Sequence, residues 1–363
     1  MTPDNRIIRG DDIVRSVADA LQYISYFHPP DYIRTLAQAY EREQSAPAKN
    51  AIGQILVNSR MAAFGRRPIC QDTGLVVVFA KVGMAARITS EKSFADLVNE
   101  GVRQAYLDDD NPLRASMVSD PLGRRVNTKD NTPAVVHVEL VPGNEVEITI
   151  AAKGGGSENK ARFACLNPSA SVADWVVDTV AGLGSGWCPP GLVSVGIGGS
   201  AEKAMLLAKE AMNAPIDMAE LLARGPSSAE EALRIELYER INALGIGAQG
   251  LGGLTTVLDV KIRTCPTHAA SKPVAMIPNC AATRHAHFVL DGSGPAFLEP
   301  PSLDLWPAVH WAPDYERSRR VDLDTLTAAE VASWFAFEPS FRSGVSTVRP
   351  SALRKLRHSI ISS

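Results

Sequence analysis

Three of the five cysteines in this 363-residue chain stand in segments whose residue types suit metal chemistry. Cys70 is followed by an amide and a carboxylate in PICQDTG, Cys188 precedes two prolines, and Cys280 follows an asparagine. Three widely separated cysteines in loops bounded by Gly or Pro suit an iron–sulfur cluster assembled from distant segments. The C-x-x-C spacing of zinc ribbons is absent. Taken singly, however, a cysteine is more often a buried filler than a ligand.

Two glycine-rich segments could bind an anion through their backbone N–H groups. Residues 153–160 read KGGGSENK, and residues 195–200 read VGIGGS and lead into a predicted helix. Neither is a Walker loop, and a flexible turn or close helix–strand packing would explain these glycines equally well. His268, twelve residues before Cys280, is either an ordinary buried histidine or an active-site residue.

The composition of the whole chain excludes several classes of function. The 37 Lys and Arg against 40 Asp and Glu give a net charge of −3, so no positive field attracts nucleic acid or an anionic membrane. Only 6% of residues are aromatic, which argues against a base-stacking surface. Residues 1–6 show no apolar signal segment. Since an odd, sparse set of cysteines is typical of a reducing compartment, we expect a cytoplasmic protein.

The elements that must position these loops follow from the hydrophobic pattern, which predicts a mixed α/β chain with a helical N-terminal region. Residues 135–141 and 145–152 alternate around Pro142-Gly143-Asn144 and predict a β-hairpin. Apolar residues at helical spacing predict helices over residues 11–24, 31–46, 49–63, 92–107, 169–183, 200–213 and 227–243. Further strands are predicted over residues 75–82, 192–197 and 255–262.

Taken together, the segments resemble the class I fumarate hydratases, iron–sulfur hydro-lyases that also include two-subunit tartrate dehydratases. The resemblance runs from about residue 10 to residue 334. It is carried by PICQDTG (68–74), NTPAVVHVELVPG (131–143), KGGGSENK (153–160), GWCPPG (186–191), VGIGGS (195–200) and PTHAASKPVAMIPNCAA (266–282). PTHAASKP and residues 285–307 favour a fumarase over a tartrate dehydratase. The resemblance implies an α+β cluster-binding domain of the hydro-lyase alpha type.

The resemblance also implies a cofactor and a reaction. Cys70, Cys188 and Cys280 would hold a [4Fe-4S] cluster with one iron free of protein ligands. That iron would act as a Lewis acid in the reversible hydration of fumarate to (S)-malate, a reaction of the tricarboxylic acid cycle. Cys165 and Cys265 lie outside the motifs and are expected to be packing residues.

Further site residues are carried over from the same motifs. The resemblance implies that Asp72 is a general acid or proton relay and that His268 hydrogen-bonds to the substrate. Arg114 would form a fork-like pair with a substrate carboxylate. The remaining substrate-binding residues would be Gln71, Gly154 and Gly155.

The resemblance finally implies a domain organisation. Residues 1–284 would form the alpha-type domain, residues 285–334 a connector, and residues 335–363 an atypical basic tail, with a short helix at 322–334. Single-chain fumarases continue into a smaller β/α domain with a TGRDAAHKR motif, which this sequence lacks. We therefore expect a homodimer that needs a separate beta subunit for activity. The alternatives are a tartrate dehydratase-like subunit, a non-catalytic cluster-binding remnant, and a zinc or metal-free protein.

Overall fold

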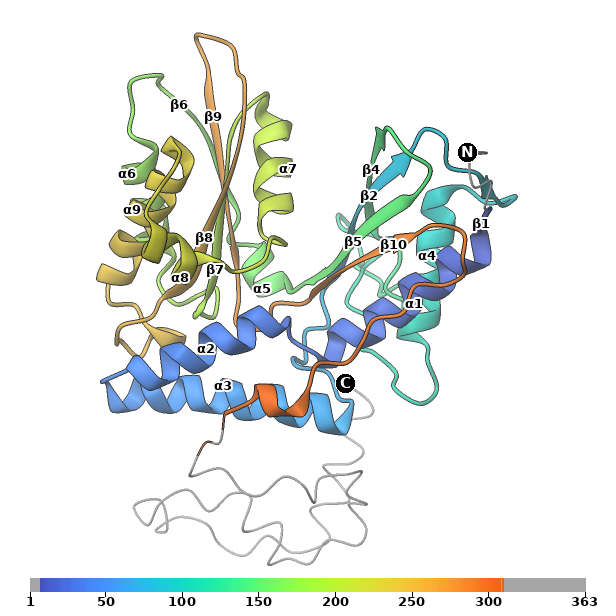
Figure 1. Cartoon of the computed structure of the whole chain (residues 1–363), viewed down its shortest axis with the longest axis horizontal. Helices are drawn as coiled ribbons and strands as arrows, with labels where there is room; N and C mark the ends of the chain where they lie inside the picture. The colour runs from blue at the N-terminus through green and yellow to red at the C-terminus, as the bar shows by residue number, and fades with distance from the viewer. Residues whose placement is uncertain (1–6, 308, 310–363) are drawn as a thin grey trace, which may run out of the picture. The chain divides into compact units, whose positions relative to one another are not determined.

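The computed structural model describes residues 7–307 and residue 309, and every structural statement below refers to these residues. They form a mixed α/β unit with helices and three sheets, as the sequence predicts (Figure 1). The predicted helix at 322–334 and the basic tail lie outside the described residues. No helix in the described range is long and apolar enough to cross a membrane.

The predicted N-terminal helices are confirmed. They are α1 (Gly10–Tyr26), α2 (Pro30–Arg42) and α3 (Ala46–Gly65). Helix α1 buries Ile13, Val17, Leu21 and Ile24, which recur every three or four residues on one face. Each such side chain stabilises the fold by roughly 1.5–3 kcal/mol relative to an exposed one.

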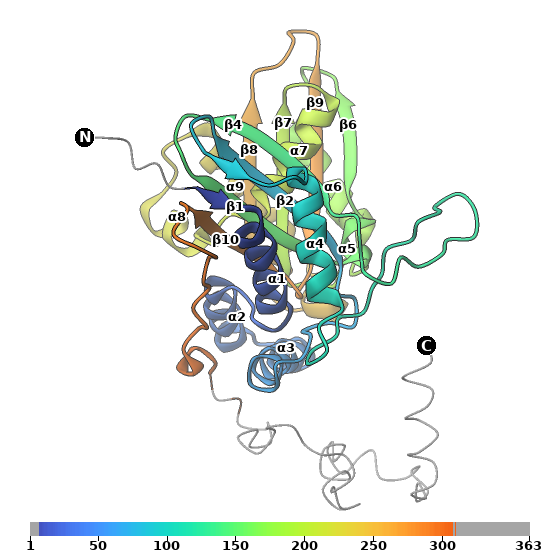
Figure 2. The same ribbon diagram turned by 90° about the vertical axis from the view of Figure 1, so that its right-hand side faces the viewer.

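Helix α4 (Phe94–Tyr106) packs along α1 (Figure 2). The helices approach closely at Gly101, where a Cβ atom would lie 2.6 Å from the carbonyl oxygen of Val14. Together they cover one face of the first sheet, whose strands contribute Val78, Ile150 and Phe288 to the same core. Because Gly101 carries no side chain, α1 and α4 can lie close together, and both helices pack on that face of the sheet.

The first sheet has the strand order β10-β5-β2-β4. Its strands are β2 (Leu75–Gly83), β4 (Val135–Val141), β5 (Val146–Lys153) and β10 (His285–Leu290). Strand β2 pairs in parallel with β4 and antiparallel with β5, and β10 pairs antiparallel with β5. Strand β10 therefore places residues 285–290, predicted as connector, inside the folded sheet.

The predicted β-hairpin is wrong, although both of its strands exist. Strand β2 lies between β4 and β5, so the two do not pair. The turn at residues 142–144 crosses the end of β2, where Gly83 N donates to Glu145 O and Ala85 N donates to Gly143 O. The apolar β2 has the buried residues Val76, Val77 and Val78. Such a strand is stabilised by neighbours on both edges, a preference that a local turn pattern does not reveal.

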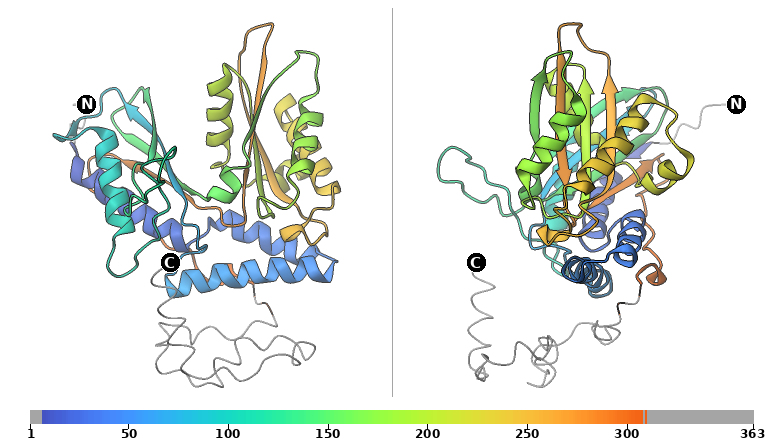
Figure 3. Two further views of the ribbon diagram at one scale, coloured as in Figure 1. Left: turned by 180° about the vertical axis from the view of Figure 1, so that it is seen from behind. Right: turned by 90° about the vertical axis from the view of Figure 1, so that its left-hand side faces the viewer.

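The second sheet has the strand order β6-β9-β7-β8. Its strands are β6 (Arg162–Leu166), β7 (Gly191–Gly198), β8 (Val257–Cys265) and β9 (Lys272–Asn279). Helices α6 (Val172–Leu183), α8 (Met218–Arg224) and α9 (Ala229–Ala243) cover one face, and α7 (Ala201–Ala211) covers the other (Figure 3). Strand β9 was not predicted, because Pro273 and Pro278 argue against an interior strand.

The remaining elements are short. Strand β1 (Ile8–Arg9) pairs in parallel with β3 (Ile88–Thr89). A four-residue helix, α5 (Gly155–Glu158), follows β5, and two 3-10 turns, η1 (Ala248–Gly250) and η2 (Leu303–Leu305), complete the described chain.

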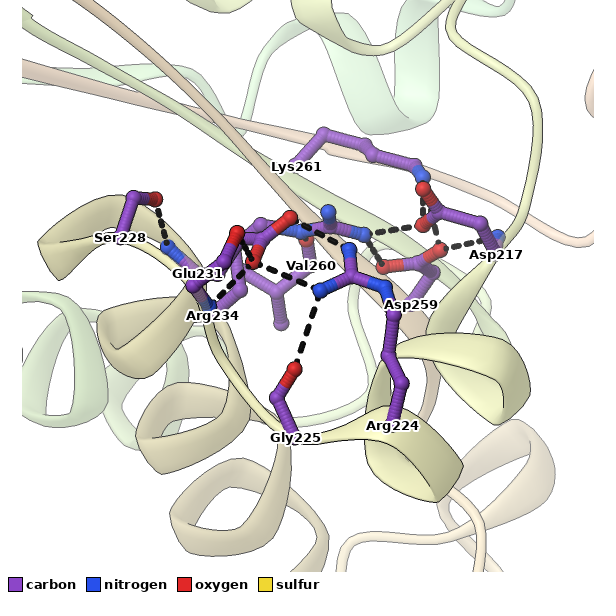
Figure 4. Close-up of polar contacts among 10 residues, drawn as sticks. Asp217, Arg224, Gly225, Ser228, Glu231, Arg234, Asp259, Val260 and Lys261 are labelled. Atoms are coloured by element: carbon purple, nitrogen blue, oxygen red, sulfur yellow. Dashed lines mark hydrogen bonds and ion pairs between the residues drawn. The ribbon is translucent and has the colours of Figure 1, made fainter.

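A buried ionic network fixes α8 and α9 to strand β8 (Figure 4). The Asp259 carboxylate, which is fully buried, lies 3.1 Å from Arg234 Nη2 and 2.9 Å from Lys261 Nζ. Asp217 pairs with the same two cations. Burial raises the pKa of Asp217, but hydrogen bonds from Arg234 and Lys261 outweigh this effect and lower it. Two acids thus balance two bases, and the network is electrically neutral.

The substitution Asp259→Asn should cost roughly 3–5 kcal/mol of unfolding free energy, because it leaves two buried cations short of a counter-charge. Denaturant unfolding at neutral pH measures the loss. Asp174→Asn is the control, since Asp174 pairs with Arg240 on the surface and its loss should matter far less. Equal losses in the two variants would contradict a stabilising role for the network.

Candidate functional site

The three motif cysteines lie in three loops that precede or follow strands. Cys70 lies between α3 and β2, Cys188 between α6 and β7, and Cys280 between β9 and β10. Ala281 N donates a hydrogen bond of 3.0 Å to Cys188 O. A Cβ atom at Gly191 would overlap the carbonyl oxygen of Asn279, so the loop before β7 lies directly on the loop after β9.

The three thiols interact electrostatically. Burial raises the pKa of the Cys188 thiol, and the negative charges of Cys280 and Cys70 raise it further. Cys280 and Cys70 therefore lie within electrostatic range of Cys188. Cys188 is exposed, and the other two are half-buried. This partial exposure differs from the full burial that a filler cysteine would show.

Cys188 also has an unusual backbone conformation. Its φ angle is 59°, in the left-handed region that residues other than glycine rarely adopt. Its N–H donates to Ser185 O at 2.9 Å, and the next carbonyl, of Pro189, accepts from the backbone N and side-chain Nε2 of Gln249. Neighbouring groups thus hold the loop in this conformation, as is common at functional sites.

Asp72 connects the first cysteine loop to the glycine-rich segment 153–160. Its Oδ2 accepts a 2.7 Å hydrogen bond from Gly155 N, and its Oδ1 accepts one of 3.1 Å from Gly74 N. A Cβ atom at Gly154 would lie 3.3 Å from the same Oδ2. In the glycine-rich segment, the N–H of Gly155 therefore binds an anionic group of this chain, the Asp72 carboxylate.

Gln71 and Arg114 lie beside the same loop. Gln71 is exposed, and its Oε1 is 3.2 Å from Cys70 Sγ, which donates to it. Arg114 is exposed as well, and its carbonyl oxygen accepts a hydrogen bond from the hydroxyl of Thr73. The structure thus brings together Cys70, Gln71, Asp72, Arg114, Gly154 and Gly155, and the Cys188 thiol lies within electrostatic range of both Cys70 and Cys280.

His268 is not brought into this group within the chain. It lies in the exposed loop between β8 and β9, where its Nδ1 accepts from Ala270 N at 3.1 Å. Cys280 follows the other end of β9, and an eight-residue strand spans about 25 Å at roughly 3.3 Å per residue. His268 and Cys280 therefore lie beyond opposite ends of β9, the strand labelled in Figure 1.

The second glycine-rich segment, 195–200, also lies at that distant end. Gly199 N donates to Pro266 O, next to the His268 loop. A Cβ atom at Gly196 would overlap the carbonyl oxygen of Ala204 in α7. Close packing of a helix on a strand accounts for Gly196, and no part of this segment touches the cysteine loops.

Two buried cations near the cysteines were not predicted as site residues. Lys153 is 1% exposed, and burial lowers its pKa to about 8, opposed by the charges of Cys280 and Glu158. Arg284 is 2% exposed and lies four residues after Cys280 in the sequence. A charged residue at a strand end is normally solvated, so the sequence did not indicate that either side chain is buried, although Lys153 begins the glycine-rich segment 153–160.

His28 was also missed, and it supports the Cys280 loop. Its Nε2 lies 3.0 Å from Ala281 O and its Nδ1 lies 2.8 Å from Ser59 Oγ. Burial lowers the pKa of His28 to about 3, so the ring is neutral at physiological pH. Because a carbonyl only accepts, Nε2 carries the proton and Ser59 donates to Nδ1. Trp306 Nε1 donates in turn to Ser59 Oγ at 2.9 Å.

The two remaining cysteines are not core residues, contrary to the expectation that they pack inside the protein. Cys165 is exposed on β6, and Cys265 is half-buried at the end of β8. Cys165 therefore offers an exposed thiol away from the motif loops.

Comparison with known proteins identifies the family. A family model described as fumarate hydratase (Fumerase) matches residues 14–289. A putative L(+)-tartrate dehydratase subunit alpha of Methanocaldococcus jannaschii is 35% identical over 284 residues, covering 76% of this chain and 95% of that protein. An L(+)-tartrate dehydratase subunit alpha of Escherichia coli O157:H7 is 31% identical over 289 residues, covering 78% and 92%. The chain belongs to the fumarate hydratase (Fumerase) family of hydro-lyases and carries its alpha-type domain.

Proposed function

We propose that this chain catalyses the reversible addition of water to fumarate, giving (S)-malate, at a [4Fe-4S] cluster held by Cys70, Cys188 and Cys280. The observation that carries the proposal is the approach of the cysteine loops: Ala281 N donates to Cys188 O, and the charges of Cys280 and Cys70 raise the pKa of the Cys188 thiol. L(+)-tartrate is the second candidate substrate, because the relatives described above bear the name of L(+)-tartrate dehydratase. The two reactions share the same elimination of water from a hydroxy diacid.

The donor set fits a cluster better than a single ion. Among the described residues, no three His, Cys, Asp or Glu side chains are grouped so that they could hold one metal ion. In a cubane cluster each cysteine binds a different iron, so three ligands need not converge on one point. Three thiols from three loops would leave a fourth iron without a protein ligand. When bound, such a cluster supplies a Lewis acid for the substrate oxygen atoms.

Asp72 is our candidate for the group that moves a proton. The N–H groups of Gly74 and Gly155 fix its two carboxylate oxygen atoms from different segments. We propose that Asp72 delivers a proton to the leaving hydroxyl in the dehydration direction and recovers it from water in the reverse reaction. A carboxylate whose orientation is fixed in this way needs no reorganisation during the transfer.

Substrate recognition is proposed for the exposed groups around this loop. Arg114 presents a guanidinium suited to a bidentate pair with a carboxylate, and its backbone is tied to Thr73. Gln71 lies next to Cys70 and can bind the second polar end of a diacid. Gly154 and Gly155 are assigned to the same substrate site, where the N–H of Gly155 orients the Asp72 carboxylate and Gly154 lies beside that carboxylate. We assign no substrate contact within one chain to His268, because it lies at the far end of β9.

A second polypeptide is part of the proposal. The relatives are named as alpha subunits, and removing the proton from the substrate carbon requires a base beyond Asp72. We propose that a beta subunit or domain supplies this base, and that the alpha domains pair as a homodimer. Activity assays should therefore include the reconstituted chain with and without such a partner.

The substitution Cys188→Ser should abolish stable cluster binding, because one of three ligands is lost. After anaerobic reconstitution, iron and sulfide per chain and the broad visible absorbance should fall to a small fraction of the wild-type values. Cys165→Ser is the matched control, since Cys165 is an exposed thiol outside the site, and it should load fully. Loading of the Cys188 variant to the level of this control would refute the ligand assignment.

The substitution Asp72→Asn should leave the cluster bound and slow turnover roughly 10²–10⁴-fold, the usual contribution of a general acid or base. Initial rates of fumarate hydration with the beta subunit present, normalised to iron content, measure the effect. A variant with full activity at equal cluster content would remove Asp72 from the mechanism.

Among small diacids, fumarate and (S)-malate should have the highest kcat/KM, ahead of L(+)-tartrate and methyl-substituted fumarates. Rates for all of these, measured on one anaerobic preparation, decide between the candidates. A higher kcat/KM for L(+)-tartrate would identify the enzyme as a tartrate dehydratase. A chain that binds the cluster but turns over none of them, even with a beta subunit present, would favour the non-catalytic alternative.

A further inference from the structure

The guanidinium of Arg284 is buried without a counter-charge in contact with it. Its Nη1 and Nη2 atoms are inaccessible and have no hydrogen-bond partner within the described part of the chain. Its Nε donates to Ala282 O at 3.2 Å, which is a neutral partner. The side chain thus brings a full positive charge into the interior, with one weak hydrogen bond to stabilise it.

Such a charge is costly, and the other buried cations of this protein avoid the cost in two ways. Arg234 is paired with Asp217 and Asp259. Lys153 donates to Ser157 Oγ, and its pKa of about 8 allows it to lose its proton near neutral pH. A guanidinium cannot deprotonate in a protein, so Arg284 has neither remedy. A buried charge of this kind needs negative charge nearby.

The surroundings of Arg284 indicate which groups could supply this negative charge. Its carbonyl oxygen accepts from Ala152 N at 3.0 Å, which places it beside the end of β5. A Cβ atom at Gly154 would lie 3.3 Å from Asp72 Oδ2 and 3.6 Å from Arg284 Nη2. The carboxylate and the guanidinium therefore approach one point without forming an ion pair. The charge of Arg284 also lowers the pKa of His28, which lies against the Cys280 loop.

We propose that Arg284 is a positioning residue whose fixed positive charge compensates the negative charge of the cysteine-bound cluster and of Asp72. Cysteine binds metal as a thiolate, and three thiolates on a [4Fe-4S] core leave a net negative charge in a partly buried region. Arg284 acts through its electric field and not by touching substrate, because its Nη atoms are covered by protein. The inference rests on the proposed function, since it requires that the cluster binds.

Two variants, Arg284→Met and Arg284→Lys, separate the effect of the positive charge from the effect of the side chain's shape. Arg284→Met should lower cluster affinity by roughly 10- to 100-fold, the scale seen for groups that support metal ligands from the outer shell. It should also shift the cluster's reduction potential to more negative values, because a nearby positive charge favours the reduced form. Arg284→Lys keeps the charge and should retain most of the cluster. Iron and sulfide retention during anaerobic dialysis against a chelator, together with potentiometric titration, give these readouts.

The cluster-free protein provides the decisive contrast. If Arg284 awaits an anion, Arg284→Met should leave the denaturant midpoint of the cluster-free chain unchanged or raise it, since an uncompensated charge is removed. Arg234→Met is the control: it removes a guanidinium that is also buried but is paired with Asp217 and Asp259, and the denaturant midpoint of this variant should fall. A comparable fall for Arg284→Met would show a purely structural residue and overturn the proposal.

Two further results would also overturn it. Equal cluster loss in Arg284→Lys and Arg284→Met would show that charge is not the property that matters. Wild-type-like retention and potential in Arg284→Met, on a wild-type chain that does load its cluster, would refute the inference and leave the proposed function intact. A wild-type chain that takes up no iron and sulfide would refute both.

Discussion

The candidate site depends on one close backbone contact, between the start of β7 and the end of β9, where two cysteine loops adjoin these strands. Gly191 leaves room for the carbonyl of Asn279, and Ala281 N bonds to Cys188 O. Any side chain at Gly191 would push these two loops apart and separate Cys188 from Cys280. The neutral ring of His28 stabilises the loop that carries Cys280 by donating a hydrogen bond to the Ala281 carbonyl. Two cysteines ninety-two residues apart in sequence thereby become neighbours.

The cysteine loops adjoin the two four-stranded sheets, between which the chain passes more than once. Cys70 precedes β2 of the first sheet, whereas Cys188 precedes β7 of the second. The glycine-rich segment after β5 leads from the first sheet to β6 of the second, and Cys280 lies where the chain returns from β9 to β10. The chemically distinctive loops are thus the places where the chain enters or leaves a sheet. Residues in such loops are held by a rigid strand on one side and remain free to meet residues of another segment.

Most elements of this fold could be predicted from sequence, because their hydrophobic periodicity is strong. The pairing of β4 and β5 could not, since the insertion of β2 between them depends on which apolar strand needs two neighbours. Strand β9 contains Pro273 and Pro278, which are unusual in an interior strand, so the sequence did not predict it. At the site, the cysteines and Asp72 were indicated by ordered motifs, whereas Lys153 and Arg284 resemble ordinary surface cations in sequence. Their burial is a property of the tertiary structure, and so is the distance between His268 and Cys280.

The two glycine-rich segments show why composition alone leaves function open. At Gly196 the missing side chain admits the backbone of α7, and the result is tighter packing of a helix on a strand. At Gly154 the missing side chain leaves a space that Asp72 and Arg284 approach from two directions, and the neighbouring N–H of Gly155 binds the carboxylate. One residue type thus serves packing in one segment and charge placement in the other. What distinguishes them is the group that occupies the space, a helix carbonyl or an ionised side chain. Asp72 and Arg284 approach each other at Gly154 without forming an ion pair, so both charges remain available to a bound group. We therefore assign segment 153–160 to the chemistry of the site and segment 195–200 to the packing of the fold.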